Sequence, residues 1–253
     1  QFRRRIGNLS NRDILFLLVI IAAGSSFASL INSEGFSREW RSGWYQNFST
    51  EIVGAVLTFL LFDMLIQTRE QKEHTIRDLS SCINHTARRA AEELHARGWL
   101  QDGSLRSMDL TDADLRGARM SDADLQRANL WRANLNRVQF IKANLTGANL
   151  TDALLHEANL DGACLHEAQL IRADLQEVLL FQTDMCGANL RDANLSRAQH
   201  IEYVRFDEHT ILPDESLWTA DADLMRFTDP AHPDFWRSDN PISPAYQDDM
   251  EHV

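Results

Sequence analysis

The chain has 253 residues and a formal net charge of −12 at pH 7, with 25 lysine and arginine residues against 37 aspartate and glutamate residues. This balance disfavours an ordinary nucleic-acid-binding protein, because such proteins carry a basic excess that neutralises phosphates. A hydrophobic content of 44% excludes wholesale disorder, and the three cysteines imply no disulfide framework.

Residues 1–68 predict a transmembrane hairpin with spans at about residues 14–31 and 50–67. The first stretch contains no formally charged side chain, and its length suffices to cross a bilayer core of about 30 Å. A cleaved secretory signal and a buried helix of a soluble domain remain as alternatives for it. The second stretch contains Asp63, which would reach headgroup water or pair with Arg12 on an antiparallel first helix.

Small residues on both predicted spans would let the two helices approach closely, among them Gly24 on the first and Gly54 on the second. The loop between the spans has two basic residues, Arg38 and Arg41, whereas more basic residues flank the other ends of the hairpin. By the positive-inside rule, both termini are expected in the cytoplasm. We therefore expect a protein of the inner (plasma) membrane of a bacterium, with the lipid bilayer as one partner.

Residues 69–98 predict an amphipathic connecting helix. Its apolar residues recur at spacings of three and four from Ile76 to Leu94, and Gly98 would end it. The apolar stripe would be buried either against the neighbouring domain or against a second copy in a short coiled coil. His74 and His85 share a helix face, but without a third ligand at close spacing they predict no metal site.

The region 99–206 is dominated by a five-residue repeat. Of 19 pentad centres from Leu105 to Leu195, 16 are leucine, and alanine stands two residues before the centre in 14 of the 19 pentads. A period of five would spread these leucines around every face of an α-helix, so the region is not helical. One large and one small inward residue per pentad instead suit a coiled backbone in which each pentad forms one side of a tube.

Stretches such as ADLRGARMSDADLQRANLWRANL, residues 113–135, resemble the pentapeptide-repeat family, whose pattern is A(D/N)LXX. The resemblance implies an all-β fold, a right-handed quadrilateral β-helix with four pentads per coil. Leucine ladders would fill such a tube and leave no lumen and no active-site cavity. The predicted fold class is thus an all-β solenoid preceded by an α-helical hairpin and a connecting helix.

Four pentads per coil place residues 20 apart in one column on the outside of the tube. One column alternates in charge at every level, and we expect it to set the register of stacking, because opposite charges on adjacent strands attract. Exposed pairs of this kind contribute only about 0–1 kcal/mol each. The members of this charge ladder are Asp112, Arg132, Asp152, Arg172 and Asp192.

Apolar residues at outward positions are exceptions on an otherwise polar tube. Trp131 and Ile171 share one side, and Ile141, Leu179 and Phe181 lie on the opposite side. The hypothesis is that these five residues contact a partner protein, and the alternative is that the chain's own C-terminus covers them. His156 and His166 fall on opposite sides of the tube and form no site together.

Residues 207–253 predict a C-terminal cap with a short helix near residues 220–227 and an acidic tail that contains prolines. Both ends of a β-helix expose apolar side chains and unpaired strand edges, so they must be covered. Trp99 and Leu100 are placed to cover the first coil, and Phe206 and Trp218 the last.

No catalytic motif, cofactor site or metal site is expected in the chain. The sequence favours a non-enzymatic, membrane-anchored scaffold or accessory subunit that presents a rigid cytoplasmic β-helix to other proteins or to a second copy, with no nucleic-acid partner. One alternative is a pore formed by association of hairpins. Another is a DNA mimic of the gyrase-inhibiting type, which the nearly neutral tube disfavours.

Overall fold

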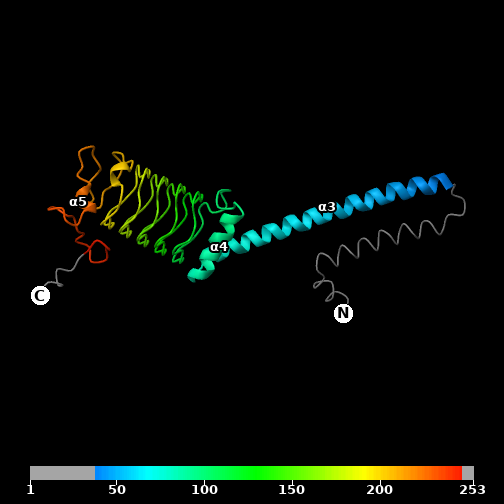
Figure 1. Cartoon of the computed structure of the whole chain (residues 1–253), viewed down its shortest axis with the longest axis horizontal. Coiled ribbons are helices and arrows are strands. Elements are labelled where there is room, and N and C mark those ends of the chain that lie inside the picture. Colours follow the sequence, from blue (N-terminus) through cyan, green and yellow to red (C-terminus); the bar gives the residue numbers. More distant parts are fainter. Residues whose placement is uncertain (1–37, 247–253) are drawn as a thin grey trace. The chain divides into compact units, whose positions relative to one another are not determined.

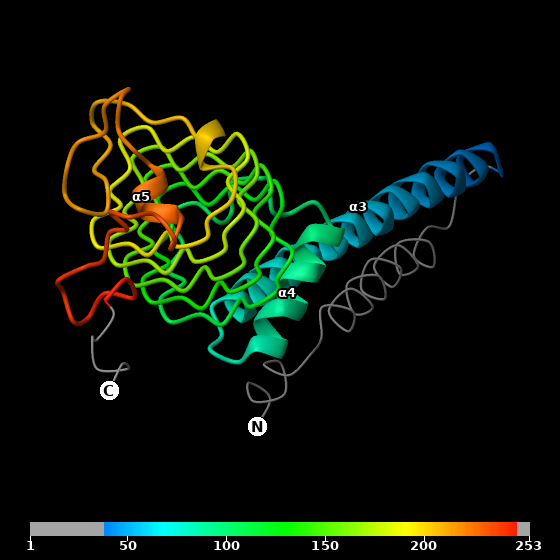
Figure 2. The same cartoon turned by 60° about the vertical axis from the view of Figure 1, so that its left-hand side comes forward.

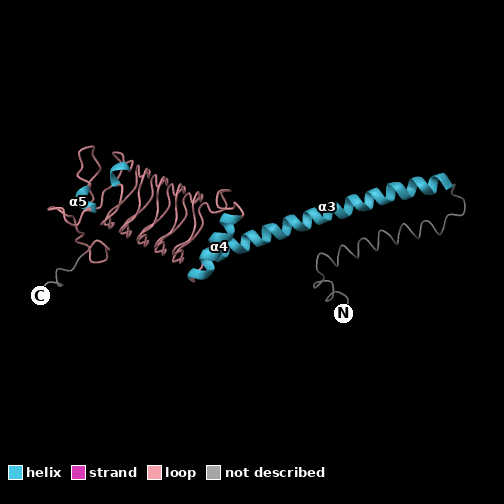
Figure 3. Ribbon diagram, viewed as in Figure 1, coloured by secondary structure: helices cyan, strands magenta, loops and turns pink. Residues whose placement is uncertain are grey.

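The computed structural model describes the backbone of residues 38–246 and the side chains of residues 53–246. Helical elements in this range are α3 (Arg38–Leu79), α4 (Asn84–Ala96), the 3₁₀ helix η1 (Ile201–Tyr203) and α5 (Met225–Thr228) (Figures 1 and 3). The chain divides into two compact units, residues 1–71 and residues 72–253.

Helix α3 contains the second predicted span, residues 50–67, but within residues 38–246 we find no helix that is both long and apolar enough to cross a membrane. Asp63 interrupts its apolar run, and Arg69 and Glu70 follow in the same helix. This finding overturns the predicted location in a bacterial inner membrane, with cytoplasmic termini and the bilayer as a partner. The first predicted span, residues 14–31, lies outside the described residues.

Of the four residues proposed to hold a hairpin together, the structure describes Asp63 and Gly54. Asp63 accepts a hydrogen bond from Nε2 of Gln67, one turn further along α3, at 2.8 Å. A Cβ atom added at Gly54 would meet no described atom within 4 Å, so the expected close helix approach is not seen among the described residues. Arg12 and Gly24 lie outside the described residues.

The predicted connecting helix, residues 69–98, is divided into the end of α3 and the whole of α4. The chain turns after Leu79, where Ser81 accepts the N–H of Ile83 through Oγ at 3.1 Å. The carbonyl oxygen of Ser81 accepts the N–H of Asp114 in the first coil at 3.0 Å, which accounts for the break. The buried face of α4 belongs to the same hydrophobic cluster as the coils, so the neighbouring domain covers the stripe; its residues are Ala87, Ala90, Ala91 and Leu94.

The repeat folds as a right-handed quadrilateral β-helix, whose coils lie one behind another in Figure 2. Parallel bridges of a single residue join positions 20 apart, from Asp109↔Asn129 to Leu179↔Gln199, which is why Figure 3 draws the coils as loops. From Leu110 to Ala193, every pentad centre and every residue two before it is fully buried. Side chains therefore fill the tube along its length.

Each corner of the coil is a tight turn. The residue two after the pentad centre has a positive φ, for example 56° at Asp112, and Ala113 N–H bonds to the carbonyl of Leu110 at 3.1 Å. This is the pattern of a type II turn. A side chain in this conformation costs roughly 1–2 kcal/mol. The N–H of Asp112 also donates a hydrogen bond to the carbonyl of Trp131 on the next coil at 3.0 Å. The turn therefore adds a backbone hydrogen bond between coils, which offsets part of this cost.

An aspartate or asparagine precedes 12 of the 19 pentad centres, and most of these residues close a second, smaller turn. The side-chain oxygen accepts the backbone N–H two residues later, as between Asn159 and Asp161 at 2.9 Å and between Asn149 and Thr151 at 3.2 Å. These residues favour turns because their short side chains reach their own backbone. The family pattern A(D/N)LXX thus has a physical cause at each of its three specified positions.

Leu154 occupies one of these positions without a side-chain oxygen. The N–H of His156, which such an oxygen would accept, bonds instead to Oδ1 of Asn136 on the preceding coil at 3.0 Å. A neighbouring coil can therefore supply the acceptor that the local sequence lacks.

The five-residue register ends after Ala198, and the last parallel bridges join residues 21 and 22 apart, Asp184↔Arg205 and Asn189↔Ile211. The remaining chain closes the tube with Leu212 and Phe227, which are buried. The ring of Phe227 packs against Trp236 with centroids 5.8 Å apart. The predicted helix at residues 220–227 is the shorter helix α5, Met225–Thr228.

Candidate interaction surface

The filled interior leaves the outside of the β-helix as the place for a functional site. Two cavities of about 320 and 410 Å³ lie between the last coils and the C-terminal segment, the first beside Phe227 and Trp236, the second beside Asp192 and Asn240. They arise where the chain covers the end of the tube, not within the stack of coils.

The charge ladder runs along the left-handed turn positions of one side. Arg172 forms a two-point pair with Asp152, at 2.7 and 2.8 Å, and Nε of Arg132 lies 3.3 Å from Oδ1 of Asp112. The hydrogen bonds from Arg172 hold the pKa of the Asp152 carboxyl below its usual value. The structure therefore brings these four charges together in two pairs of unequal geometry.

Asp192, the last member of the ladder, contacts the C-terminal segment. Its carboxylate accepts hydrogen bonds from Oγ of Ser238 and, at 3.3 Å, from Nδ2 of Asn240. Its carbonyl oxygen accepts Oγ of Ser243 at 2.6 Å. The last residue of the charge ladder thus holds the C-terminal segment that closes the tube.

Trp131 lies beside the ladder and is 38% exposed. Its indole N–H donates to Asp152 at 3.1 Å, and the guanidinium of Arg132 lies 5.2 Å from the centre of its ring. Ile171 is half-buried, and Thr151 occupies the coil between it and Trp131. These contacts hold Trp131 in place, and the two apolar side chains form no continuous patch.

The opposite side carries a cluster of exposed rings, which we call the aromatic patch: Phe181, His200 and Tyr203. Phe181 is 39% exposed and Tyr203 is 53% exposed. The ring of Phe181 meets Tyr203 edge-on with centroids 5.2 Å apart, and His200 at 5.9 Å. Ile141 and Leu179, predicted on this side, are half-buried.

Of the aromatic patch, sequence reasoning identified Phe181 but not the other two rings. His200 and Tyr203 follow the point at which the repeat loses its register, so their column could not be read by counting. The available signal was compositional, because His200, Tyr203 and Phe206 follow one another within seven residues, about one coil after Phe181. Phe181 is set by a hydrogen bond from its N–H to Asp161 at 2.9 Å.

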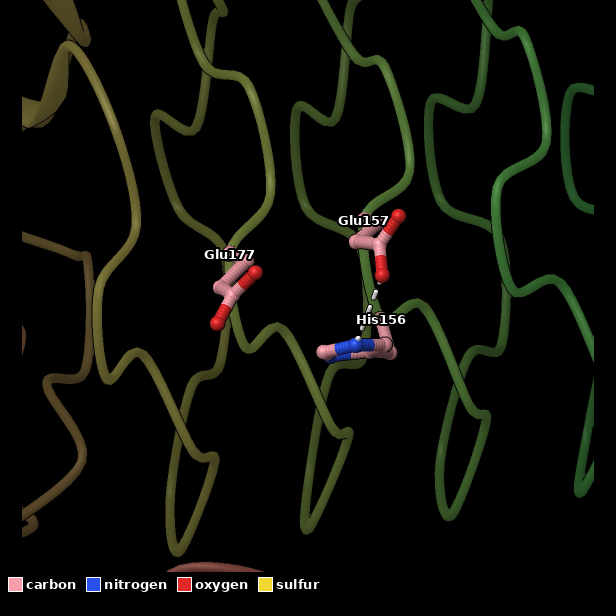
Figure 4. Close-up of side chains that lie close together, drawn as sticks. All are labelled: His156, Glu157 and Glu177. Atoms are coloured by element: carbon pink, nitrogen blue, oxygen red, sulfur yellow. Dashed lines mark ion pairs between the residues drawn. The ribbon is translucent and has the colours of Figure 1, made fainter.

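A third surface feature joins two adjacent coils (Figure 4). Each of His156, Glu157 and Glu177 offers a metal-ligand atom, and these atoms lie within 4.8 Å of one another. The hydrogen bonds from Arg137 hold the pKa of the Glu157 carboxyl below its usual value. Sequence reasoning found that His156 and His166 lie on opposite sides of the tube and form no site together, and it did not consider Glu157 and Glu177 beside His156.

Comparison with known proteins agrees with this architecture. The family model for pentapeptide repeats matches in eight copies over residues 100–132, 133–170 and 168–199. A pentapeptide repeat protein from Nostoc PCC 7120 is 36% identical over 42% of this chain and 83% of its own, with a TM-score of 0.37. No curated protein matches the sequence.

Two further solved structures are similar. HetL, a pentapeptide repeat protein involved in heterocyst differentiation regulation from Nostoc sp. strain PCC 7120, is 31% identical over 45% of this chain and 59% of its own, with a TM-score of 0.29. A pentapeptide repeat protein from the Arabidopsis thaliana thylakoid lumen is 27% identical over 37% of this chain, with a TM-score of 0.37, and the match spans 66% of its length. The repeat, its coils and the family match together show that the chain belongs to the pentapeptide-repeat family.

Proposed function

We propose that the chain is a protein-interaction scaffold that binds another protein through the outer face of its β-helix, without catalytic chemistry of its own. Proteins of the pentapeptide-repeat family are non-enzymatic scaffolds for protein interactions, some of them with regulatory roles. The observation that carries the proposal is the aromatic patch, with Phe181 and Tyr203 exposed on a tube whose other outward positions are mostly polar.

Exposed aromatic rings favour protein contact for a physical reason. They offer a large apolar area at a low entropic cost, and they are enriched among the residues that dominate binding energy. Ion pairs between coils, such as Arg172 with Asp152 and Arg197 with Glu177, neutralise much of the charge on the tube. That arrangement fits a protein partner better than a mimic of the DNA backbone.

The test compares two variants of the full chain in a quantitative pull-down from the native cell extract. In the first variant, Phe181→Ser with Tyr203→Ser, the aromatic patch is removed. In the second, Leu154→Asn, a single apolar side chain of similar exposure, 41%, is removed from another side of the tube. Leu154→Asn also places a residue of the family pattern at its position, so its fold should be retained.

We expect the double variant to lose a specific protein at least tenfold relative to the wild-type chain, and Leu154→Asn to retain it. Direct titration of the purified captured protein should show the same order. Equal capture by all three chains with equal melting temperatures would refute the aromatic patch as the binding surface.

A further inference from the structure

Glu157 and Glu177 stand one above the other at the same turn position of adjacent coils. Within residues 105–197, this is the one place where carboxylates occupy equivalent positions on neighbouring coils. Elsewhere a carboxylate at a turn position has an arginine, a lysine or a glycine beside it, as Asp152 has Arg172. Like charges stacked on adjacent strands are destabilising, so this pair calls for a cation.

Two arginines neutralise the glutamates from the outer sides of the pair. Arg137, on the coil below, forms a two-point pair with Glu157 at 2.9 Å, and Arg197, on the coil above, lies 3.1 Å from Glu177. The group beside both carboxylates is the imidazole of His156, whose Nε2 lies 3.1 Å from Glu157 (Figure 4). The cluster therefore combines one nitrogen ligand with two oxygen ligands.

These donors match a borderline transition-metal ion. Zn²⁺ binds histidine nitrogen and carboxylate oxygen at about 2.0–2.2 Å, and water can complete a set of three protein ligands. The three side chains are half-buried, so small rotations about their torsions can contract the cluster. The competing arginine pairs are partly exposed and screened by solvent, so an ion can displace them.

We propose that His156, Glu157 and Glu177 form a surface site for a divalent transition-metal ion of the Zn²⁺ type, which joins two adjacent coils of the β-helix. The ion takes the imidazole and one glutamate from one coil and the second glutamate from the next. It bridges the stacked carboxylates and ties the coils together, so its binding stabilises the folded chain.

The chain contains its own control for this proposal. His166 and Glu167 occupy the same two turn positions on the opposite side of the tube, with Nε2 of His166 3.6 Å from Glu167. The residue stacked above Glu167 is Gly187, so the second carboxylate is missing there. A Cβ atom at Gly187 would lie 3.3 Å from Cγ of Glu167, a flexible side chain that can move aside.

The experiment titrates ZnCl₂ into the full chain, produced without a histidine tag and stripped with a chelator, by calorimetry and by thermal melting. Wild type should bind one ion at this site and melt at a higher temperature with Zn²⁺. His156→Gln and Glu177→Gln should each weaken this binding at least tenfold and abolish the thermal shift. His166→Gln should change neither, and Gly187→Glu should add a second binding event.

Circular dichroism of each variant without metal shows whether its fold is retained. If a folded His156→Gln or Glu177→Gln variant bound Zn²⁺ as tightly as wild type, the assignment would be overturned. The absence of binding to wild type at 1 mM Zn²⁺ would overturn it as well. Neither result bears on the aromatic patch, which involves other residues and is tested by protein capture.

Discussion

Asparagine and aspartate recur before the pentad centre because their side chains close the backbone where it turns. Each such oxygen accepts a backbone N–H that has no backbone hydrogen bond to a neighbouring coil, as Asn159 does for Asp161. An N–H left without an acceptor costs up to about 1–3 kcal/mol when it is buried, so this small contact matters most at the corners that are covered from solvent. The bond between Asn136 and His156 shows that the acceptor can also come from the coil below.

We expect Asn136→Ala to lower the free energy of unfolding by about 1 kcal/mol, because His156 N–H then loses its acceptor. Leu154→Asn alone should be nearly neutral. Combined with Asn136→Ala it should restore most of the loss, because the new side chain supplies the local acceptor. Denaturant melts of the four chains form a double-mutant cycle, and strict additivity of the two changes would contradict this explanation.

Arg172→Gln should destabilise the fold by about 1 kcal/mol at pH 7, because it removes a two-point, charge-assisted pair with Asp152. The pKa of Asp152 is lowered in the folded state by these hydrogen bonds. The pair therefore stabilises the fold above the unfolded pKa of about 3.9, and this contribution is lost as the pH falls through the lowered folded pKa. Melts of both chains should converge at low pH.

The matched control for this prediction is Arg132→Gln. Arg132 meets Asp112 through one contact at 3.3 Å, and the two side chains are 56% and 52% exposed. Solvent screens such a pair, so the change should be within about 0.5 kcal/mol at any pH. If Arg172→Gln and Arg132→Gln lost equal free energy of unfolding, the position of a pair in the charge ladder, rather than its geometry, would decide how much it stabilises the fold.

At the scale of elements, Ser81 and Asn84, which lie just before α4 and at its start, contact the first coil where a preceding coil would otherwise be. The side-chain amide of Asn84 donates to the carbonyl of Asp114 at 3.3 Å, to its carboxylate at 3.2 Å and to the carbonyl of Arg116 at 3.0 Å. Ser81 accepts the N–H of Asp114 in the same place. The loop between two helices thus provides partners for a strand edge that would otherwise be open.

Asn84→Ala should lower the free energy of unfolding by about 1–2 kcal/mol and speed hydrogen exchange of the Asp114 amide. The neighbouring exposed residue provides the control, since His85→Ala should change stability by less than about 0.5 kcal/mol. Unchanged exchange at Asp114 in a folded Asn84→Ala chain would show that the Asn84 side chain does not hold this junction.

At the scale of the whole molecule, stability of the second unit is approximately that of a row of coils, each in contact with its neighbours. Such a row needs a cover at both ends. Asp192 holds the cover at the C-terminal end through Ser238, Asn240 and Ser243. The last carboxylate of the charge ladder therefore performs a different task from the first.

Asp192→Ala should loosen the C-terminal segment and leave the coils folded. Loss of two side-chain hydrogen bonds lowers the free energy of local opening by about 1–2 kcal/mol, so limited proteolysis within residues 229–246 should proceed about tenfold faster. The melting temperature of the coils should change little. Asp112→Ala, at the opposite end of the ladder, serves as the control, and equal proteolysis of the two variants would disprove the role of Asp192.

Much of the β-helix could be predicted from the sequence, because each pentad places its inward residues by local turn geometry. Counting in twenties also predicted which outward residues share a column, so the stacking of Arg172 on Asp152 and of Glu177 on Glu157 was readable in advance. The prediction of a second membrane span failed because it relied on the hydropathy of residues 50–67. In α3 that run contains Asp63 and continues into charged residues.

The amino-acid sequence alone determined the period and the inward residues, since one large and one small residue recur every five positions, and the resemblance to the pentapeptide-repeat family implied the four-sided coil and its filled core. Tertiary structure alone decided the break between α3 and α4, the partner of Asp192 and the meeting of Phe181 with Tyr203. These features join residues outside the repeat to residues within it. Their contacts depend on where the irregular chain returns in space, and no local period encodes that return.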